Sequence, residues 1–230
     1  MQDNTKERSY RYIDLLTGLF VAVLLISNIA STKIIGVWKF TFDGGTLLFP
    51  LSYIFGDILT EVYGYKKSRR IIWIGFFCAL LLSVTLAVIG LIRPAAGWDL
   101  QAEYMAILGQ TPRIITASLI AYFAGEFSNS YIMAKLKIKT EGRWLALRTI
   151  GSTVVGQGVD TVIFVVIAFW GLYSNNLIAL IILSNYVFKV LMEVVLTPLT
   201  YKVVKVLKKA EKVDHYDVGT DFNPFKFSDK

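Results

Sequence analysis

The sequence predicts an all-α membrane protein: a bundle of six transmembrane helices with the N- and C-termini in the cytoplasm. Three observations support this fold class: few charges, long apolar stretches, and basic residues gathered on one side. Of the 230 residues, 55% are hydrophobic and only 18% are charged. An ordinary soluble domain has roughly 25% charged residues, so the composition indicates a chain that crosses the bilayer several times.

A transmembrane helix needs about 20 mostly apolar residues, and six stretches reach or approach that length. The third contains no charged residue. The second is short and contains Pro50 and two acids, so a tilted or partly re-entrant helix also fits it. In the sixth, Pro198 is expected to kink the helix or end its last turn. The six stretches are 12–31, 47–63, 71–92, 113–133, 149–170 and 177–201.

The basic residues define the predicted orientation. Nineteen of the 24 lysines and arginines fall in the N-terminus, in the loops after the second and fourth stretches, and in the C-terminal region. Basic residues concentrate on the cytoplasmic side of membrane proteins, which places both termini there. The net charge of +7 therefore indicates topology, and no nucleic-acid partner is expected.

The chain is predicted to form one transmembrane domain, residues 1–209, followed by a flexible cytoplasmic tail, residues 210–230. The first apolar stretch is too long for the core of a signal peptide, so we interpret it as a retained span. Cys78 is the one cysteine and His215 the one histidine. A disulfide framework and a Cys- or His-based metal site are thus excluded within one chain, and no metal or cofactor is expected.

Besides Asp14 and Arg113 in the first turns of their spans, six charged residues lie inside the predicted spans, where a charge costs about 2.5–3.5 kcal/mol or more. One cation faces five acids, so some acids must be protonated, paired with cytoplasmic basic residues, or held for a ligand. Their polar neighbours recur at helical spacing, which gives four spans a polar stripe each. These stripes are predicted to converge on a cavity near the midplane. They comprise Tyr53, Asp57 and Glu61; Tyr122, Glu126, Asn129 and Ser130; Gln157, Asp160 and Thr161; and Asn185, Lys189 and Glu193.

Purely structural explanations compete with this interpretation. Glu61 could pair with Arg69 or Arg70 at the cytoplasmic edge, and Lys189 could pair with Glu193 one turn away. Glu126 and Asn129 could join two helices.

Asp160 is the hardest residue to explain structurally. It is mid-span, and Gly156 and Gly158 would let another group approach closely. A carboxylate accepts two parallel N–H bonds from a guanine-like edge, amides bind the other edge, and aromatic rings stack on the base. The stripes therefore suit a flat polar heterocycle.

Four segments resemble one known family in order along the chain. "GGTLLFPLSYIFGDILTEVYGYKKSRRIIW" resembles the signature of the queuosine precursor transporter family, also called the vitamin uptake transporter family. "GEFSNSYIMAKLK", "GSTVVGQGVDTVIF" and "YVFKVLMEVVLTP" resemble its later blocks. Together the similarity covers roughly residues 12–209.

The resemblance implies a multi-pass transporter of the bacterial plasma membrane, the inner membrane in a Gram-negative cell. It implies import of 7-cyano- or 7-aminomethyl-7-deazaguanine for tRNA modification, or of queuine. It also implies an architecture similar to the substrate-binding subunits of energy-coupling-factor transporters. On that basis a substrate-binding role is expected for Asn28, Tyr53, Asp57, Glu126, Asn129, Gln157, Asp160, Lys189 and Glu193.

Several alternatives stay open at this point. No G-x-x-x-x-G-K-[ST] motif occurs, so an ATP-driven importer would need a coupling module on another chain. A stand-alone carrier, as a monomer or a homo-oligomer, would use an ion gradient, and the surplus of acids permits proton coupling. An intramembrane enzyme and a structural membrane protein are the rival classes. We expect a transporter and not an enzyme.

Overall fold

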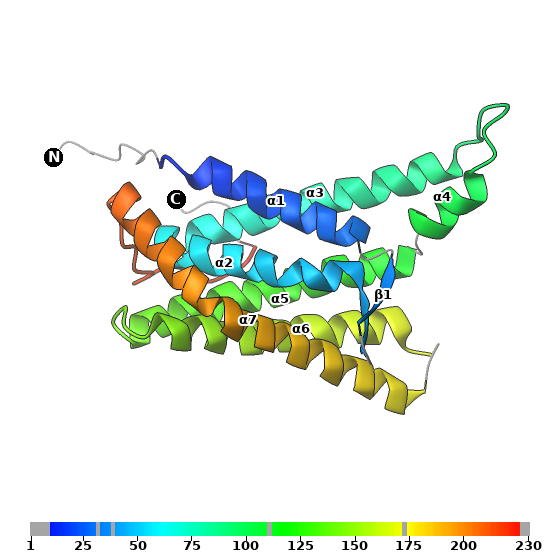
Figure 1. Ribbon diagram of the computed structural model, residues 1–230. Helices are drawn as coiled ribbons and strands as arrows, with labels where there is room; N and C mark the ends of the chain where they lie inside the picture. Colours follow the sequence, from blue (N-terminus) through cyan, green and yellow to red (C-terminus); the bar gives the residue numbers. More distant parts are fainter. Residues whose placement is uncertain (1–9, 31–32, 38–39, 110–111, 172–173, 226–230) are drawn as a thin grey trace.

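The computed structural model describes residues 10–30, 33–37, 40–109, 112–171 and 174–225. Within these ranges the chain forms seven α-helices and one short β-hairpin (Figure 1). The helices are α1 (Ile13–Ala30), α2 (Phe49–Tyr63), α3 (Tyr65–Leu91), α4 (Gln101–Ile107), α5 (Pro112–Lys139), α6 (Leu145–Phe169) and α7 (Asn175–Glu211). The hairpin strands are β1 (Ile34–Val37) and β2 (Phe40–Asp43), and the 3-10 turn η1 (Gly44–Leu47) leads from them into α2.

The all-α fold class is confirmed, and the short hairpin is a local addition to it. The hairpin joins α1 to α2, and its antiparallel strands pair Ile34 with Asp43 and Val37 with Phe40. Four-residue strands are too short for a period-two pattern to be distinguished from a loop in sequence. The rest of the fold is helical, as predicted.

Four of the six predicted spans correspond to helices that are long and apolar enough to cross a membrane. They are Ile13–Ala30, Tyr65–Leu91, Leu145–Ala168 and Ile178–Glu211. The other two predicted spans correspond to α2, which has only 15 residues, and α5, which carries Glu126 and several lysines. That α2 and α5 also cross the bilayer stays a prediction.

The position of α2 and α5 explains why they are less apolar. α2 packs on α1, α3, α5 and α7, and α5 packs on α2, α3 and α6, so both lie between an α1–α3 layer and an α6–α7 layer (Figure 1). From Gly56 to Tyr65 every side chain is buried. The outer helices instead expose large apolar residues such as Leu15, Leu81 and Val195. These exposed apolar surfaces suit contact with lipid, and the outer layers cover the polar inner helices.

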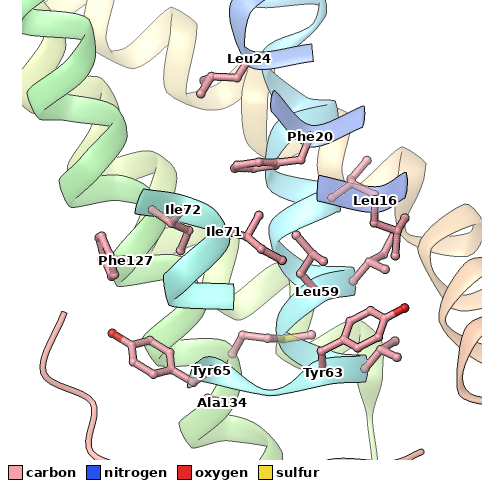
Figure 2. Close-up of a cluster of buried hydrophobic side chains, with 14 of the residues drawn as sticks. Leu16, Phe20, Leu24, Leu59, Tyr63, Tyr65, Ile71, Ile72, Phe127 and Ala134 are labelled. Carbon is pink, nitrogen blue, oxygen red and sulfur yellow. The ribbon is translucent and has the colours of Figure 1, made fainter. Parts of the chain in front are cut away.

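An apolar core fixes α1 against the rest of the bundle. Leu16, Phe20 and Leu24 project from successive turns of α1 toward Leu59 of α2 and Ile72 of α3 (Figure 2). All five are buried. Burial of such side chains stabilises the packing by about 1.5–3 kcal/mol each. This core lies on the side of α2 that faces α1, which leaves its other side to the polar residues.

One end of the bundle collects most of the basic residues, and we call it the basic end. It contains the α2–α3 turn at Gly64, the α5–α6 turn at 140–144 and the end of α7, close to the start of α1 (Figure 1). Gly64 has a φ of +85°, a backbone conformation that favours glycine. The hairpin and α4 lie at the opposite end. Helix α7 continues through Pro198 to Glu211, so the expectation that the helix could end near this proline is wrong.

Candidate functional site

Seven buried polar residues from four helices form what we call the central polar cluster. At most 8% of each residue's surface is exposed. Because α2, α5, α6 and α7 pack together on the side away from the apolar core, their polar faces point inward. The members are Asp57 of α2, Glu126 and Asn129 of α5, Gln157 and Asp160 of α6, and Lys189 and Glu193 of α7.

Two interhelical contacts hold part of this cluster. The Asn129 amide donates a hydrogen bond to Oδ1 of Asp57 at 2.8 Å, which joins α5 to α2. The Lys189 ammonium donates to Oδ2 of Asp160 at 2.7 Å, which joins α7 to α6. Asp160 is therefore paired, and Lys189 pairs across helices and not with Glu193 as one structural explanation had it. The periodicity of a single helix gives no information on such cross-helix partners.

Many other polar atoms of the cluster have no hydrogen-bond partner among the described residues. They are Oδ2 of Asp57, Oδ1 of Asn129, and both terminal polar atoms of Glu126, Gln157 and Glu193. A buried polar atom left without a partner costs about 1–3 kcal/mol. So many in one place are uncommon in a purely structural core and provide acceptors and donors for a polar ligand.

Close helix packing brings these groups together. A Cβ atom at Gly56 of α2 would clash with Oε1 of Glu126, so the missing side chain makes room for this carboxylate. At Gly156 of α6 a Cβ atom would lie 2.8 Å from Cβ of Asn129. The expected close approach at Gly156 is thus confirmed, and the group that approaches is Asn129.

Two predicted site residues, Asn28 and Tyr53, are not among the members of the central polar cluster. Asn28, near the end of α1, bonds through its amide group to the Leu24 carbonyl at 2.9 Å and to the Ser118 hydroxyl at 3.0 Å. The hydrogen bond from Ser118 joins α5 to α1. Tyr53 belongs to α2, but its side chain lies outside the described residues. The prediction that both bind substrate stays a prediction.

Unpartnered hydroxyl groups add residues that the predicted site omitted. The hydroxyls of Ser52, Tyr122, Thr153 and Thr161 are buried without a hydrogen-bond partner among the described residues. Tyr122 and Thr161 were in the predicted polar stripes, so helical spacing gave a usable signal for them. Serine and threonine are common in apolar helices, so the sequence gave no signal for Ser52 and Thr153.

A second buried network closes the basic end around Glu61. Arg148 of α6 and Lys208 of α7 both donate to the Glu61 carboxylate. Lys137 of α5 lies 3.4 Å from the same carboxylate and donates to the Glu61 carbonyl at 2.7 Å. Asp214 binds Lys137 and Lys208 at 2.8 Å each. This network ties α2, α5, α6 and α7 together.

The structure corrects the expected partner of Glu61. Arg69 instead donates to the carbonyls of Asp221 and Asn223 at 3.0 and 2.7 Å. Proximity in sequence suggested Arg69 and Arg70. The actual partners come from helices that are distant in sequence, so only the tertiary packing could identify them.

Residues after α7 pack along α3 through these and further contacts. Both carboxylate oxygens of Asp217 accept the Tyr65 N–H at 3.0 Å, which caps the N-terminus of α3. The Trp73 indole donates to the Pro224 carbonyl at 2.8 Å. That residues 210–230 form a flexible tail stays a prediction about motion.

The described residues contain no group of three His, Cys, Asp or Glu side chains placed to hold a metal ion. What this part of the chain does offer is a polar interior enclosed by apolar outer helices. A buried polar site enclosed by helices long and apolar enough to cross a membrane is typical of multi-pass membrane transporters.

Comparison with known proteins identifies the family within that class. Residues 43–203 match the family model described as "Putative vitamin uptake transporter", and the chain belongs to this family. It is a transporter family and not a family of enzymes.

Individual relatives agree with this assignment. The chain is 29% identical to a "Probable queuosine precursor transporter" of Bacillus subtilis, over 85% of this chain and 87% of that protein. It is 26% identical to the "Queuosine precursor transporter" of Escherichia coli, over 83% and 85% of the two chains. A Haemophilus influenzae relative is 28% identical over 55% of this chain and 51% of its own length. No solved structure matches the chain.

Proposed function

We propose that this protein imports queuosine precursors, the bases 7-cyano- and 7-aminomethyl-7-deazaguanine, for tRNA modification. Two relatives that align with more than 80% of the chain are named for transport of queuosine precursors, which supports the substrate class. In this proposal all six long helical segments cross the bacterial plasma membrane, and the basic end faces the cytoplasm.

The observation that carries the proposal is the set of unpartnered polar atoms in the central polar cluster. A 7-deazaguanine presents N–H donors on one edge and acceptors on another. The carboxylates of Asp57, Glu126 and Glu193 accept N–H bonds, while the amides of Asn129 and Gln157 complement the remaining edge. A base in this position would give hydrogen-bond partners to atoms that otherwise lack them.

The buried state of the cluster also fits one stage of alternating access. Since the seven side chains are almost completely buried, neither side of the membrane reaches them in this conformation. The Glu61 network would be the barrier on the cytoplasmic side, and breaking it would release the substrate there.

Restoration of queuosine in tRNA tests the proposal. We would express the full chain in a bacterial strain that cannot make the precursor and lacks its own importer, then supply each base at nanomolar concentration. We expect queuosine to return with at least one base. A matched variant pair, Glu193→Gln inside the cluster and Glu103→Gln on exposed α4, shows whether the cluster is required. No restoration despite normal membrane expression would contradict import by this chain alone.

A further inference from the structure

Three acids of the central polar cluster form no ion pair among the described residues. Among the described residues, no lysine, arginine or histidine forms an ion pair with Asp57, Glu126 or Glu193. Lys189 is the cation of the cluster, and Asp160 engages it at 2.7 Å. The cluster therefore contains four acids and one base, Lys189.

The three acids form one group although they come from three helices. A Cβ atom at Gly56, the residue before Asp57, would clash with Oε1 of Glu126, so these two acids lie on facing surfaces of α2 and α5. Glu193 of α7 is close enough to both for mutual Coulombic repulsion. A further group marks the same place: Asn129 donates to Asp57, and its own Oδ1 is fully buried without a partner among the described residues. We call Asp57, Glu126 and Glu193 the carboxylate group.

The cations of the basic end are already engaged elsewhere. Arg148, Lys137 and Lys208 surround Glu61, one helical turn after Asp57, and two of them also bind Asp214. Pulling one of them inward would leave Glu61 buried with fewer partners, which is costly. A positive charge for the carboxylate group is therefore more readily supplied by the ligand.

We propose that the carboxylate group binds a substrate ammonium, so that the protein prefers the aminomethyl base over the cyano base; this inference rests on the proposed function. Near neutral pH the aminomethyl group is an ammonium with three N–H donors, while the nitrile is neutral and offers only an acceptor. The carboxylate oxygens accept hydrogen bonds from the ammonium, whereas the nitrile nitrogen has no donor for them. The guanine-like edge is common to both bases and gives no discrimination.

Binding of the two bases to purified full-length protein in lipid nanodiscs tests this preference. We expect the aminomethyl base to bind about tenfold tighter or more, the usual value of a charge-assisted hydrogen bond. Equal binding, or tighter binding of the cyano base, would overturn the inference while the proposed function stands. If neither base binds, the proposed function fails as well.

A matched variant pair locates the preference. For Glu193→Gln we expect the ratio of the two affinities to fall toward one, because the variant removes a negative charge and keeps the side-chain size. For Glu103→Gln on exposed α4 we expect the wild-type ratio. A wild-type ratio in both Glu193→Gln and Glu126→Gln would overturn the role of the carboxylate group.

Discussion

Asp160 and Lys189 join α6 to α7 through a buried ion pair, with the ammonium nitrogen 2.7 Å from the carboxylate oxygen. The pair lies beside Glu126, which interacts electrostatically with Asp160. Its first role is thus to neutralise one acid and one base in the interior of the protein. Its second is to keep Lys189 away from the carboxylate group.

Disruption of this pair should reduce transport. In Asp160→Asn, Lys189 loses its ion pair with Asp160 and can turn toward Glu193 one turn away, so we expect uptake to fall more than about tenfold with normal membrane expression. Lys189→Met should have a comparable effect. The double variant should lose less than the two single losses combined, because it leaves neither charge alone. Uptake of labelled base is the measurement, and Asp14→Asn at the exposed start of α1 is the control.

The Glu61 network should dominate the stability of the basic end. Glu61→Gln leaves Arg148 buried beside a neutral side chain and leaves Lys137 with Asp214 as its acidic partner, and breaking a buried ion pair in this way costs about 3–5 kcal/mol. We expect a clear drop in the unfolding temperature in detergent. Glu141→Gln, at an exposed position of the α5–α6 turn, should leave it unchanged. Equal unfolding temperatures for both variants would contradict this account of the network.

Helix packing at Gly56 should be sensitive to a single methyl group. Gly56→Ala places Cβ against the Glu126 carboxylate, so α2 and α5 must separate or Glu126 must move, at a cost of about 1–3 kcal/mol. We expect lower substrate affinity. Gly18→Ala on α1 is the matched control because a Cβ there meets no atom within 4 Å. Wild-type affinity in Gly56→Ala would show that Glu126 need not occupy this position.

The contact of Asp214 with the bundle should be stable across physiological pH. Burial opposes ionisation, but hydrogen bonds from Lys137 and Lys208 outweigh it and lower the pKa of Asp214 below its ordinary value. A lowered carboxyl pKa stabilises the fold at pH values above the unfolded pKa, and this contribution is lost as pH falls through the folded pKa.

Unfolding temperatures of wild type and Asp214→Asn measured against pH test this expectation. Between pH 6 and 8 we expect the two proteins to differ by a small, constant amount in unfolding temperature. The corresponding difference in the free energy of unfolding is below about 1 kcal/mol because Asp214 is partly exposed. The difference should disappear in acid, where Asp214 is protonated in both states. A difference that grows as pH falls from 8 to 6 would be inconsistent with a lowered pKa.

The sequence predicted the composition of the central polar cluster better than its pairings. Polar residues at helical spacing inside apolar stretches identified Asp57, Glu126, Asn129, Asp160 and Glu193, because charges are rare in such stretches. It could not identify which groups meet, since partners such as Asp57 and Asn129 come from different helices.

Other features depended on contacts between distant segments. The capping of α3 by Asp217 and the partners of Glu61 are set by how the helices pack. The hairpin was too short to show a pattern. Four spans could be predicted because length and hydropathy are local properties, whereas the roles of α2 and α5 depend on the helices that cover them.

Pro198 divides α7 into two parts with different attachments. Beyond the proline, Lys208 binds Glu61, and the Glu211 carboxylate accepts the backbone N–H groups of Arg11 and Tyr12. Before it lie Lys189 and Glu193. Since proline cannot donate the helical hydrogen bond, the helix is easiest to bend there. The part of α7 after Pro198 is anchored and can therefore stay in place. The part that carries Lys189 and Glu193 can then move relative to it by bending at the proline.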